Sequence, residues 1–248
     1  MSFNEKKNKS SYLVLQIDIG AGTQWGNPNT INPIREVFIP SVRNYCSKFN
    51  YDYSLIRESI YEKKYGEFNF LATKNKHYSF ERYFHFDNNY DYTIYIDNDV
   101  YIYADADPIP DFTGLCNVRE PEGNSSKVFR EVNNLDSSFP YFNSGVTFCD
   151  KLTAKKLSEY MINRLEKNIT AKGKNSDNML LNEFIINNKN IFTEIGCQWN
   201  YMPFLENSMK INKPNFFHLV GIMGKEIINR LQDKDINIES FLNQLKLD

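Results

Sequence analysis

The sequence of 248 residues is poor in cysteine. Its four thiols lie far apart along the chain, at Cys46, Cys116, Cys149 and Cys197. No CxxC pair occurs, which excludes the usual spacing of a zinc site or a redox dithiol. A small disulfide-stapled domain is excluded as well, and free thiols in a reducing compartment are the simpler interpretation. The scarce glycines do not form GxGxxG after the first predicted strand, so a dinucleotide-binding fingerprint is also missing.

Two further absences concern membranes and nucleic acids. No apolar run is long enough to cross a bilayer, and residues 1–10 are polar and lysine-rich, without the apolar stretch of a signal peptide. We therefore expect a disordered arm at residues 1–10 and a cytoplasmic protein with no transmembrane segment. The net charge of -2 gives no electrostatic reason to expect a nucleic-acid partner, and no pattern predicts the oligomeric state.

The chain does have an apolar fraction of 41%, enough for a sizeable core. We expect a single α/β domain over residues 11–248. Strand-like and helical patterns alternate in the first hundred residues, at 12–19, 33–49, 51–56, 76–86 and 93–96. This order is typical of a parallel sheet.

The second half of the chain changes character. Residues 114–138 are polar, and we expect them to be irregular. The predicted elements that follow are a strand at 141–149, helices at 151–168 and 177–186, a strand and turn at 191–201, and a C-terminal amphipathic helix at 226–248.

Two carboxylates, Asp97 and Asp99, directly follow the β-branched and aromatic run that ends at Ile96. Two charges this close repel each other, and their burial is unfavourable unless a cation or hydrogen bonds compensate. A hard divalent ion bridging carboxylates and phosphate oxygens is a common compensation. The alternative is a tight turn with two solvated aspartates, which Asp-Asn-Asp would also suit. A second pair, Asp105 and Asp107, lies in a Pro-rich segment and is interpreted as loop.

Three downstream segments carry further candidate residues. Asn143-Ser144-Gly145 interrupts a strand pattern, and a glycine there indicates either close approach of a ligand or an ordinary bulge. Asp177-Asn178 opens a predicted helix, as an N-cap or as a ligand contact. His218, Gly221 and Lys225 combine an imidazole, a glycine and a cation, which favours a phosphate loop over a histidine in the core.

In this order, the motifs resemble those of glycosyltransferases with the GT-A fold. The resemblance is strongest to the glycogenin and galactosyltransferase group of retaining enzymes, family 8. It covers most of the chain and rests on Asp97-x-Asp99, Asn143-Ser-Gly145, Asp177-Asn178-x-x-Leu181-Asn182, Trp199-Asn200 and His218-x-x-Gly221. It implies a Rossmann-like nucleotide-diphospho-sugar transferase fold, with a mixed, mostly parallel sheet flanked by helices. Residues 11–103 would form the nucleotide-binding half, and residues 104–225 the sugar and acceptor half.

The resemblance also implies a role for each candidate residue. Asp97, Asp99 and His218 would bind Mn²⁺ (or Mg²⁺), which bridges the diphosphate of a UDP-sugar. The base of the donor would lie near Ile17, Asp18 and Ile19, the ribose near Asn98, and Lys76 would be a basic contact. The sugar would contact Asn143, Ser144, Gly145, Asp177 and Asn178. Gly221 and Lys225 would contact the phosphates. The second substrate would be a glycan or another hydroxyl acceptor.

The chain departs from the family pattern at two motifs. Where the family has Asp-Gln-Asp, this sequence has Asp177-Asn178-Met179, and the interval from Gly221 to Lys225 is one residue longer than usual. The resemblance implies transfer of a hexose with retention. A covalent route would need a carboxylate nucleophile near the anomeric carbon, and Asp177, with Asn178 beside it, is the candidate. An inverting enzyme would instead need a general base.

Two other functions fit the same residues. Asp97-Asn-Asp99-Val after a strand also matches the start of haloacid-dehalogenase phosphatases, with Asp97 as nucleophile and Asp99 as acid and base. That hypothesis needs a later Asp-rich metal motif, which the sequence does not supply. The non-enzymatic alternative is a nucleotide- or carbohydrate-binding module without turnover.

Overall fold

The computed structural model describes residues 11–19, 33–65, 78–167, 177–203, 205, 211, 213–220, 227 and 240. Three candidate residues, Lys76, Gly221 and Lys225, lie outside this part of the chain. The same holds for residues 1–10 and for the C-terminal helix expected at 226–248, apart from Ile227 and Ser240.

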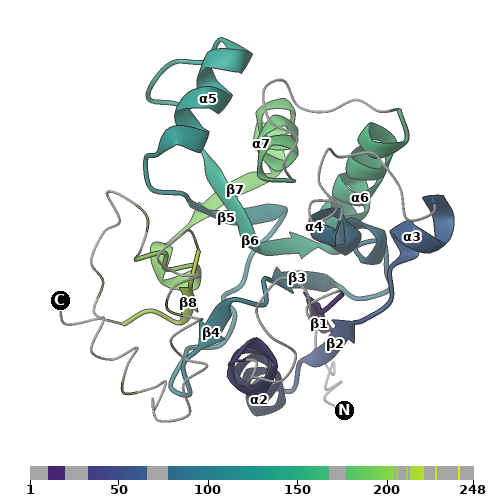
Figure 1. Ribbon diagram of the computed structural model, residues 1–248, viewed down its shortest axis with the longest axis vertical. Coiled ribbons are helices and arrows are strands. Elements are labelled where there is room, and N and C mark those ends of the chain that lie inside the picture. Colours follow the sequence, from purple (N-terminus) through teal and green to yellow (C-terminus); the bar gives the residue numbers. More distant parts are fainter. Residues whose placement is uncertain are drawn as a thin grey trace, which may run out of the picture.

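A six-stranded sheet forms the centre of the molecule (Figure 1). Its strands are β1 (Tyr12–Ile17), β2 (Asp52–Ile56), β3 (Tyr92–Ile96), β5 (Leu115–Arg119), β6 (Phe142–Asp150) and β7 (Phe192–Ile195), in the spatial order β2-β1-β3-β6-β5-β7. Within it, β6 runs antiparallel to both of its neighbours, and the other pairs are parallel. The expected mixed, mostly parallel sheet is therefore confirmed. A second sheet pairs β4 (Val100–Ile102) with β8 (Phe216–His218).

Helices cover both faces of the central sheet (Figure 1). The described helices are η1 (Ile34–Phe38), α2 (Ile39–Phe49), α3 (Ile60–Tyr65), α4 (Tyr78–Glu81), η2 (Arg82–His85), α5 (Asn124–Asn133), α6 (Lys151–Glu166), α7 (Asp177–Asn187), η3 (Lys189–Ile191) and η4 (Cys197–Trp199). On one face lie α4, α6 and α7, and on the other lie α2 and the two-stranded sheet. No described helix is long and apolar enough to cross a membrane.

Alternation along the strands explains this layering. In β1, Leu13 and Leu15 join the core under α6 and α7, whereas Val14 between them joins the core under α2. In β3, Tyr95 points to the first core and Ile94 to the second. Successive strand side chains point to opposite faces, so a sheet covered on both sides needs apolar residues at consecutive positions. All four cysteines are free, as the sequence predicts.

The expectation of an irregular segment at 114–138 is wrong, because β5 and α5 lie within it. In β5 the pattern is broken by Asn117, a fully buried polar residue. Its amide donates to the carbonyls of Asn143 and Val146 and to the Thr147 hydroxyl, at 2.9–3.0 Å. The partners that make this burial tolerable come from β6, so the short sequence window around Asn117 cannot reveal them.

Candidate functional site

The candidate residues that the structure describes gather where the order of the strands reverses. Following the chain, β2 pairs with one edge of β1 and β3 with the other. Ligands of open α/β sheets bind at the carboxyl ends of strands at such a switch point. Asp97 follows β3 here, and the side-chain amide of Asn98 donates to the carbonyl of Ile17 at the end of β1. The site therefore joins two strands that are far apart in sequence.

Asp97, Asp99 and His218 form a compact cluster of donor atoms, all within 4.8 Å of one another. The Nε2 atom of His218 lies 3.2 Å from Asp99 Oδ1 and 3.9 Å from Asp97 Oδ2. The two-stranded sheet produces this approach, because Val100 of β4 pairs with His218 of β8. Sequence reasoning expected these three residues to come together, and the structure places them together.

A chain of side-chain amides fixes the orientation of the His218 ring. Glu120, which as a carboxylate only accepts, takes a hydrogen bond from Asn143 Nδ2 at 3.1 Å. The Asn143 oxygen then accepts from Asn200 Nδ2 at 2.9 Å. The Asn200 oxygen faces His218 Nδ1 at 2.8 Å, so Nδ1 carries the hydrogen. Nε2 is consequently the ring nitrogen directed at the two carboxylates, and it can bind a cation when it is unprotonated.

This donor set fits a divalent cation. An unprotonated nitrogen facing two carboxylates is unfavourable without a positive charge between them, and one carboxylate oxygen of each aspartate is directed toward it. Carboxylates suit Mg²⁺ and Mn²⁺, and imidazole is a ligand of divalent transition metals. A histidine ligand held through its other nitrogen by a polar partner is the usual arrangement in metal sites. Three protein donors would leave coordination positions open for a substrate.

Protons compete for the same atoms. Burial raises the pKa of Asp97, and the Arg82 guanidinium opposes this only in part. Burial by itself would lower the pKa of His218, but the neighbouring carboxylates, Asp99 first, outweigh burial and raise the pKa above its usual value. A cation bound in the cluster would replace these protons.

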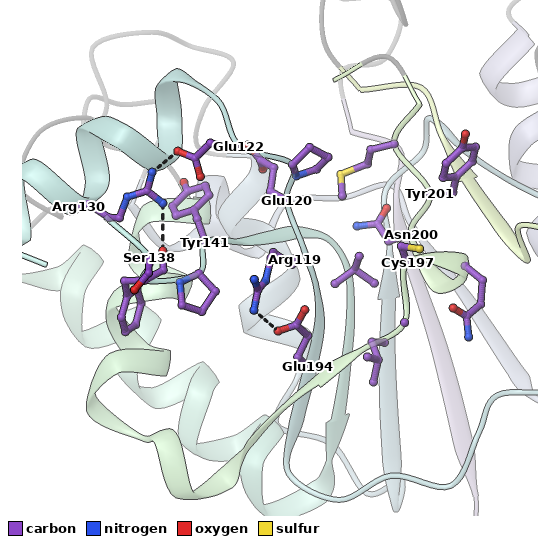
Figure 2. Close-up of a pocket in the computed structure, with 18 of the residues that line it drawn as sticks. Arg119, Glu120, Glu122, Arg130, Ser138, Tyr141, Glu194, Cys197, Asn200 and Tyr201 are labelled. Carbon is purple, nitrogen blue, oxygen red and sulfur yellow. Dashed lines mark hydrogen bonds and ion pairs between the residues drawn. The ribbon is translucent and has the colours of Figure 1, made fainter. Parts of the chain in front are cut away.

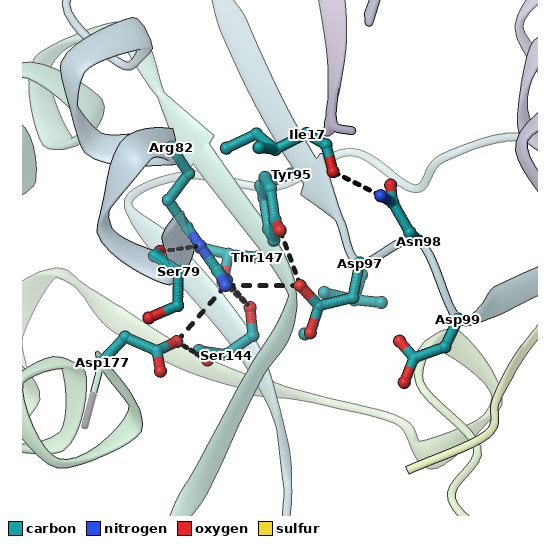
Figure 3. A network of polar contacts seen from close by, with 12 residues as sticks. Ile17, Ser79, Arg82, Tyr95, Asp97, Asn98, Asp99, Ser144, Thr147 and Asp177 are labelled. Atoms are coloured by element: carbon teal, nitrogen blue, oxygen red, sulfur yellow. Dashed lines mark hydrogen bonds and ion pairs between the residues drawn. The ribbon is translucent and has the colours of Figure 1, made fainter. Parts of the chain in front are cut away.

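Arg82 is a site residue that sequence reasoning missed (Figure 3). Its side chain is 2% exposed, and its NH2 lies 3.3 Å from both Asp97 Oδ1 and Asp177 Oδ2. The guanidinium stacks 3.7 Å from the Tyr95 ring centre, and NH1 donates to the carbonyl of Ser144 at 2.6 Å. Arg82 therefore holds one face of the cluster and the start of α7 in a fixed relation. The predicted basic contact, Lys76, lies outside the described residues and stays a prediction.

Asp177 and Asn178 open α7 and face the interrupted strand β6. Asp177 Oδ2 accepts from the Ser144 hydroxyl at 2.5 Å, and Asn178 Oδ1 accepts from the Ser144 backbone N–H at 2.8 Å. Asn178 Nδ2 donates to Glu120 at 3.2 Å. Both residues thus lie beside the cluster, and their side chains contact Ser144, Glu120 and Arg82.

Gly145 is a position of close approach. A Cβ atom added there would lie 2.2 Å from His218 Cε1 and 2.8 Å from Asp97 Oδ2. The pairing of β6 with β5 shifts its register between Asn117 and Arg119, opposite this point. The segment 143–145 therefore bulges from the sheet and lets the imidazole lie against bare backbone. The structure therefore shows a bulge at this glycine, closely approached by the His218 ring, and its role in contacting a ligand stays a prediction.

The segment expected to contact the nucleotide base contains a carboxylate that is already paired within the protein. Asp18 is buried, and its carboxylate accepts from Arg35 at 3.1–3.3 Å, with Arg57 3.7 Å away. The carboxylate is thus already neutralised by two arginines from the protein. Ile17 and Ile19 flank it in the chain, and Ile19 packs against the core. By contrast, the buried Oδ1 atom of Asn98 has no hydrogen-bond partner among the described residues.

Glu120, at the end of β5, is the second site residue missed from the sequence. Burial raises the pKa of its carboxyl, and the hydrogen bond from Asn143 offsets this only in part. The segment that contains Glu120 was expected to be irregular, so no strand end was predicted there. A charged residue one position after a strand would have been the signal.

The comparisons with known proteins bear on the fold. No protein-family model matches the chain, and no curated protein matches its sequence. Among solved structures, a glycosyltransferase involved in the glycosylation of the major capsid of PBCV-1 gives a TM-score of 0.56 at 14% identity, covering 90% of this chain and 99% of that one. The galactosyltransferase LgtC, solved in complex with donor and acceptor sugar analogues, gives 0.56 at 12% identity, covering 93% and 99%. The chain therefore has the GT-A fold, and the expected resemblance to family 8, which includes LgtC, is confirmed at the level of the fold.

Proposed function

We propose that this protein is a metal-dependent glycosyltransferase that moves a hexose from a UDP-sugar to a glycan or another hydroxyl acceptor, with retention at the anomeric carbon. The observation that carries the proposal is the cluster of Asp97, Asp99 and His218 at the switch point of the sheet. Carboxylates that share a divalent cation with a diphosphate are the feature that a nucleotide-sugar donor requires. The similarity in fold to solved glycosyltransferases supports the same assignment.

Asp97, Asp99 and His218 would hold Mn²⁺ or Mg²⁺. When bound, the cation supplies Lewis-acid stabilisation of the negative charge that develops on the departing diphosphate. Arg82 keeps Asp97 in place, since its guanidinium lies against the carboxylate oxygen that faces away from His218. Gly221 and Lys225 remain the proposed phosphate contacts, and Lys76 a proposed basic contact to the donor.

The nucleoside would lie along the ends of β1 and β3. The unpartnered Oδ1 of Asn98 accepts a hydrogen bond from a ribose hydroxyl in this proposal. The uracil would lie at the segment from Ile17 to Ile19, where Asp18 is already paired with Arg35 and contributes shape more than charge.

The transferred sugar would lie against the bulge formed by Asn143, Ser144 and Gly145. Asp177 and Asn178 remain the candidate catalytic residues at this position. Arg82 and the Ser144 hydroxyl both contact Oδ2 of Asp177, which fixes the direction of the carboxylate. A carboxylate held in this way is suited to face the positive charge that develops at the anomeric carbon. Retention is proposed from the family resemblance.

Melting temperatures with nucleotides test the proposal. Nucleotide at about 100 times its dissociation constant adds about 2.7 kcal/mol to the unfolding free energy. For a domain of this size, that corresponds to a rise of roughly 5–10 °C. We expect this rise with UDP plus Mn²⁺, little change with UDP plus EDTA or with GDP plus Mn²⁺, and no rise in Asp99→Ala. Turnover is then followed as UDP release from a panel of UDP-sugars.

The outcomes separate the three functions. No rise with any nucleotide at saturation would contradict the proposal and favour phosphatase substrates. A Mn²⁺-dependent rise without UDP release from any donor, with or without glycans, would favour the binding module. Asp105→Ala is the matched control for Asp99→Ala, because Asp105 belongs to the second Asp-x-Asp pair and lies outside the cluster. Its melting response should equal that of the unsubstituted chain.

A further inference from the structure

A cavity of about 760 Å³ opens beside the candidate site, on the side of β5 and β7 (Figure 2). Its walls come from the ends of these two strands, from the segment around Phe139 and from the turn that contains Asn200. This volume falls in the range of sites that enclose a small molecule. None of the proposed donor contacts that the structure describes lines this cavity.

The charges in the cavity wall are mostly paired. Arg119 contacts Glu194 at 2.8 Å, and Arg130 forms an ion pair with Glu122. Neither arginine is left to attract an anionic group. Glu120 has no ion-pair partner among the described residues, and its hydrogen bonds there come from the amides of Asn143 and Asn178. The wall therefore offers a carboxylate that can accept a hydrogen bond from a ligand, and it does not require the ligand to be charged.

Two residues connect the cavity to the cluster of Asp97, Asp99 and His218. Glu120 lines the cavity and receives the Asn143 amide, while Asn200 lines it and holds His218. A ligand in the cavity that donates a hydrogen bond to Glu120 would thus lie next to the bulge proposed to hold the transferred sugar. Phe139 in the wall is a partly buried aromatic side chain, of the kind on which sugar rings stack.

We propose that this cavity is the acceptor subsite, that the acceptor is the end of a neutral saccharide, and that Glu120 receives a hydrogen bond from an acceptor hydroxyl. This rests on the proposed function and adds to it the class of the acceptor. An acceptor bearing phosphate or carboxylate would meet Glu120 and two arginines that are already neutralised. A long acyl chain would meet too many polar groups in the wall.

The test blocks the cavity without touching the donor side. Glu194 and Thr193 are adjacent, exposed residues of β7 whose side chains point to opposite faces, and Glu194 lines the cavity whereas Thr193 does not. Glu194→Trp should fill the cavity, and Thr193→Trp is the matched control. The probes are the methyl glycosides of lactose, maltose and cellobiose, their phosphorylated counterparts, and a serine-containing peptide. UDP release above the rate in water is measured for each.

We expect at least one neutral glycoside to accelerate UDP release. Glu194→Trp should raise the KM for that glycoside at least tenfold, with the melting shift in UDP plus Mn²⁺ unchanged, and Thr193→Trp should leave the KM within twofold. Glu120→Gln should lower kcat/KM for the glycoside about tenfold, since the second carboxylate oxygen becomes an NH₂ group.

Three results would overturn the inference. The first is faster UDP release with the phosphorylated probes or the peptide alone. The second is no faster UDP release with any probe although the donor is hydrolysed. The third is an unchanged KM for the glycoside in Glu194→Trp. Each of these leaves the melting shift with UDP plus Mn²⁺ intact. Loss of that shift in the unsubstituted chain would instead contradict the proposed function itself.

Discussion

The guanidinium of Arg82 is a buried cation that contacts two carboxylates, those of Asp97 and Asp177 (Figure 3). Removing one member of a buried ion pair leaves the other charge uncompensated, which costs about 3–5 kcal/mol. Since both carboxylates keep some exposure, we expect Arg82→Met to lower the unfolding free energy by about 3 kcal/mol, the lower end of that range. Urea denaturation followed by circular dichroism measures the change.

Arg164→Met is the matched control, because Arg164 is a partly exposed arginine that pairs with Glu183 on the helices α6 and α7. Arg164→Met should lower the unfolding free energy by about 0–1 kcal/mol. Equal losses in the two variants would contradict a structural role for Arg82 in the site.

Gly145 gives a second prediction for a single residue. Gly145→Ala places a methyl group against the His218 ring and the Asp97 carboxylate, so these two donor groups have to move apart. We expect the affinity for Mn²⁺, measured by isothermal titration calorimetry, to fall at least tenfold. In Gly123→Ala the added methyl meets nothing closer than 3.8 Å, and its affinity should be unchanged. A variant Gly145→Ala that binds Mn²⁺ normally would show that the metal binds somewhere other than this cluster.

A site residue can be predicted from the sequence when the residues that give it its role are close to it in the chain. Asp97 and Asp99 are recognised because the strand that presents them is adjacent in sequence. His218 needed the order of several motifs, since its partners lie more than a hundred residues earlier. Arg82 gave no signal, because an arginine in a short helix is normally solvated, and the carboxylates that justify its burial come from β3 and α7.

At the scale of elements, the helix α3 is anchored by a side chain from α4. Glu81 is fully buried and accepts from the Ser59 hydroxyl and the Ile60 backbone N–H, both at 2.7 Å. Burial alone would raise the pKa of Glu81, but hydrogen bonds from His85, Ser59 and the start of α3 outweigh it, and the pKa is lowered. The stabilisation is therefore present above the pKa of the unfolded chain and is lost as the pH falls through the lower folded value.

Glu81→Gln tests this anchor. We expect it to lower the unfolding free energy by about 1–3 kcal/mol at pH 7. The difference from the unsubstituted chain should narrow once the pH falls below about 4.3, where the unfolded carboxyl becomes protonated. Guanidinium denaturation across this pH range measures it. The control is Glu58→Gln, at an exposed carboxylate paired with Lys63, and it should show no measurable effect. A difference that widens in acid would contradict the lowered pKa of Glu81.

Elements were predictable where a regular pattern was long enough. The helices at 33–49 and 151–168 were found, as was β3, because apolar residues recur along each of them. The strand β5 has five residues, as β3 does, and was missed because it places the polar Asn117 in the core. The hydrogen-bond partners of Asn117 belong to β6, which is distant in sequence, so the residues next to Asn117 in the chain do not reveal them.

At the scale of the whole molecule, the cluster joins the two sheets, because Asp97 and Asp99 flank the link from β3 to β4 and His218 belongs to β8. A cation bound there should stabilise the entire fold. We expect Mn²⁺ alone to raise the melting temperature at pH 7.5 and to raise it less at pH 5.5. The raised pKa of His218 means that a proton occupies its nitrogen in mild acid and has to leave before the metal binds. His218→Gln should show little response at either pH, whereas an equal response at both values would contradict the role of the imidazole.

The same long-range pairing has a consequence for biosynthesis. The ribosome delivers Asp97 and Asp99 well before it delivers His218, and β8 has to reach β4 before the nitrogen donor meets the two carboxylates. Contacts between distant segments form late in folding, because the chain must first close a long loop. A nascent chain therefore carries an incomplete cluster, and loading of the ion follows completion of the fold. Metal content would then report, in a cell extract, the fraction of chains that have finished maturing.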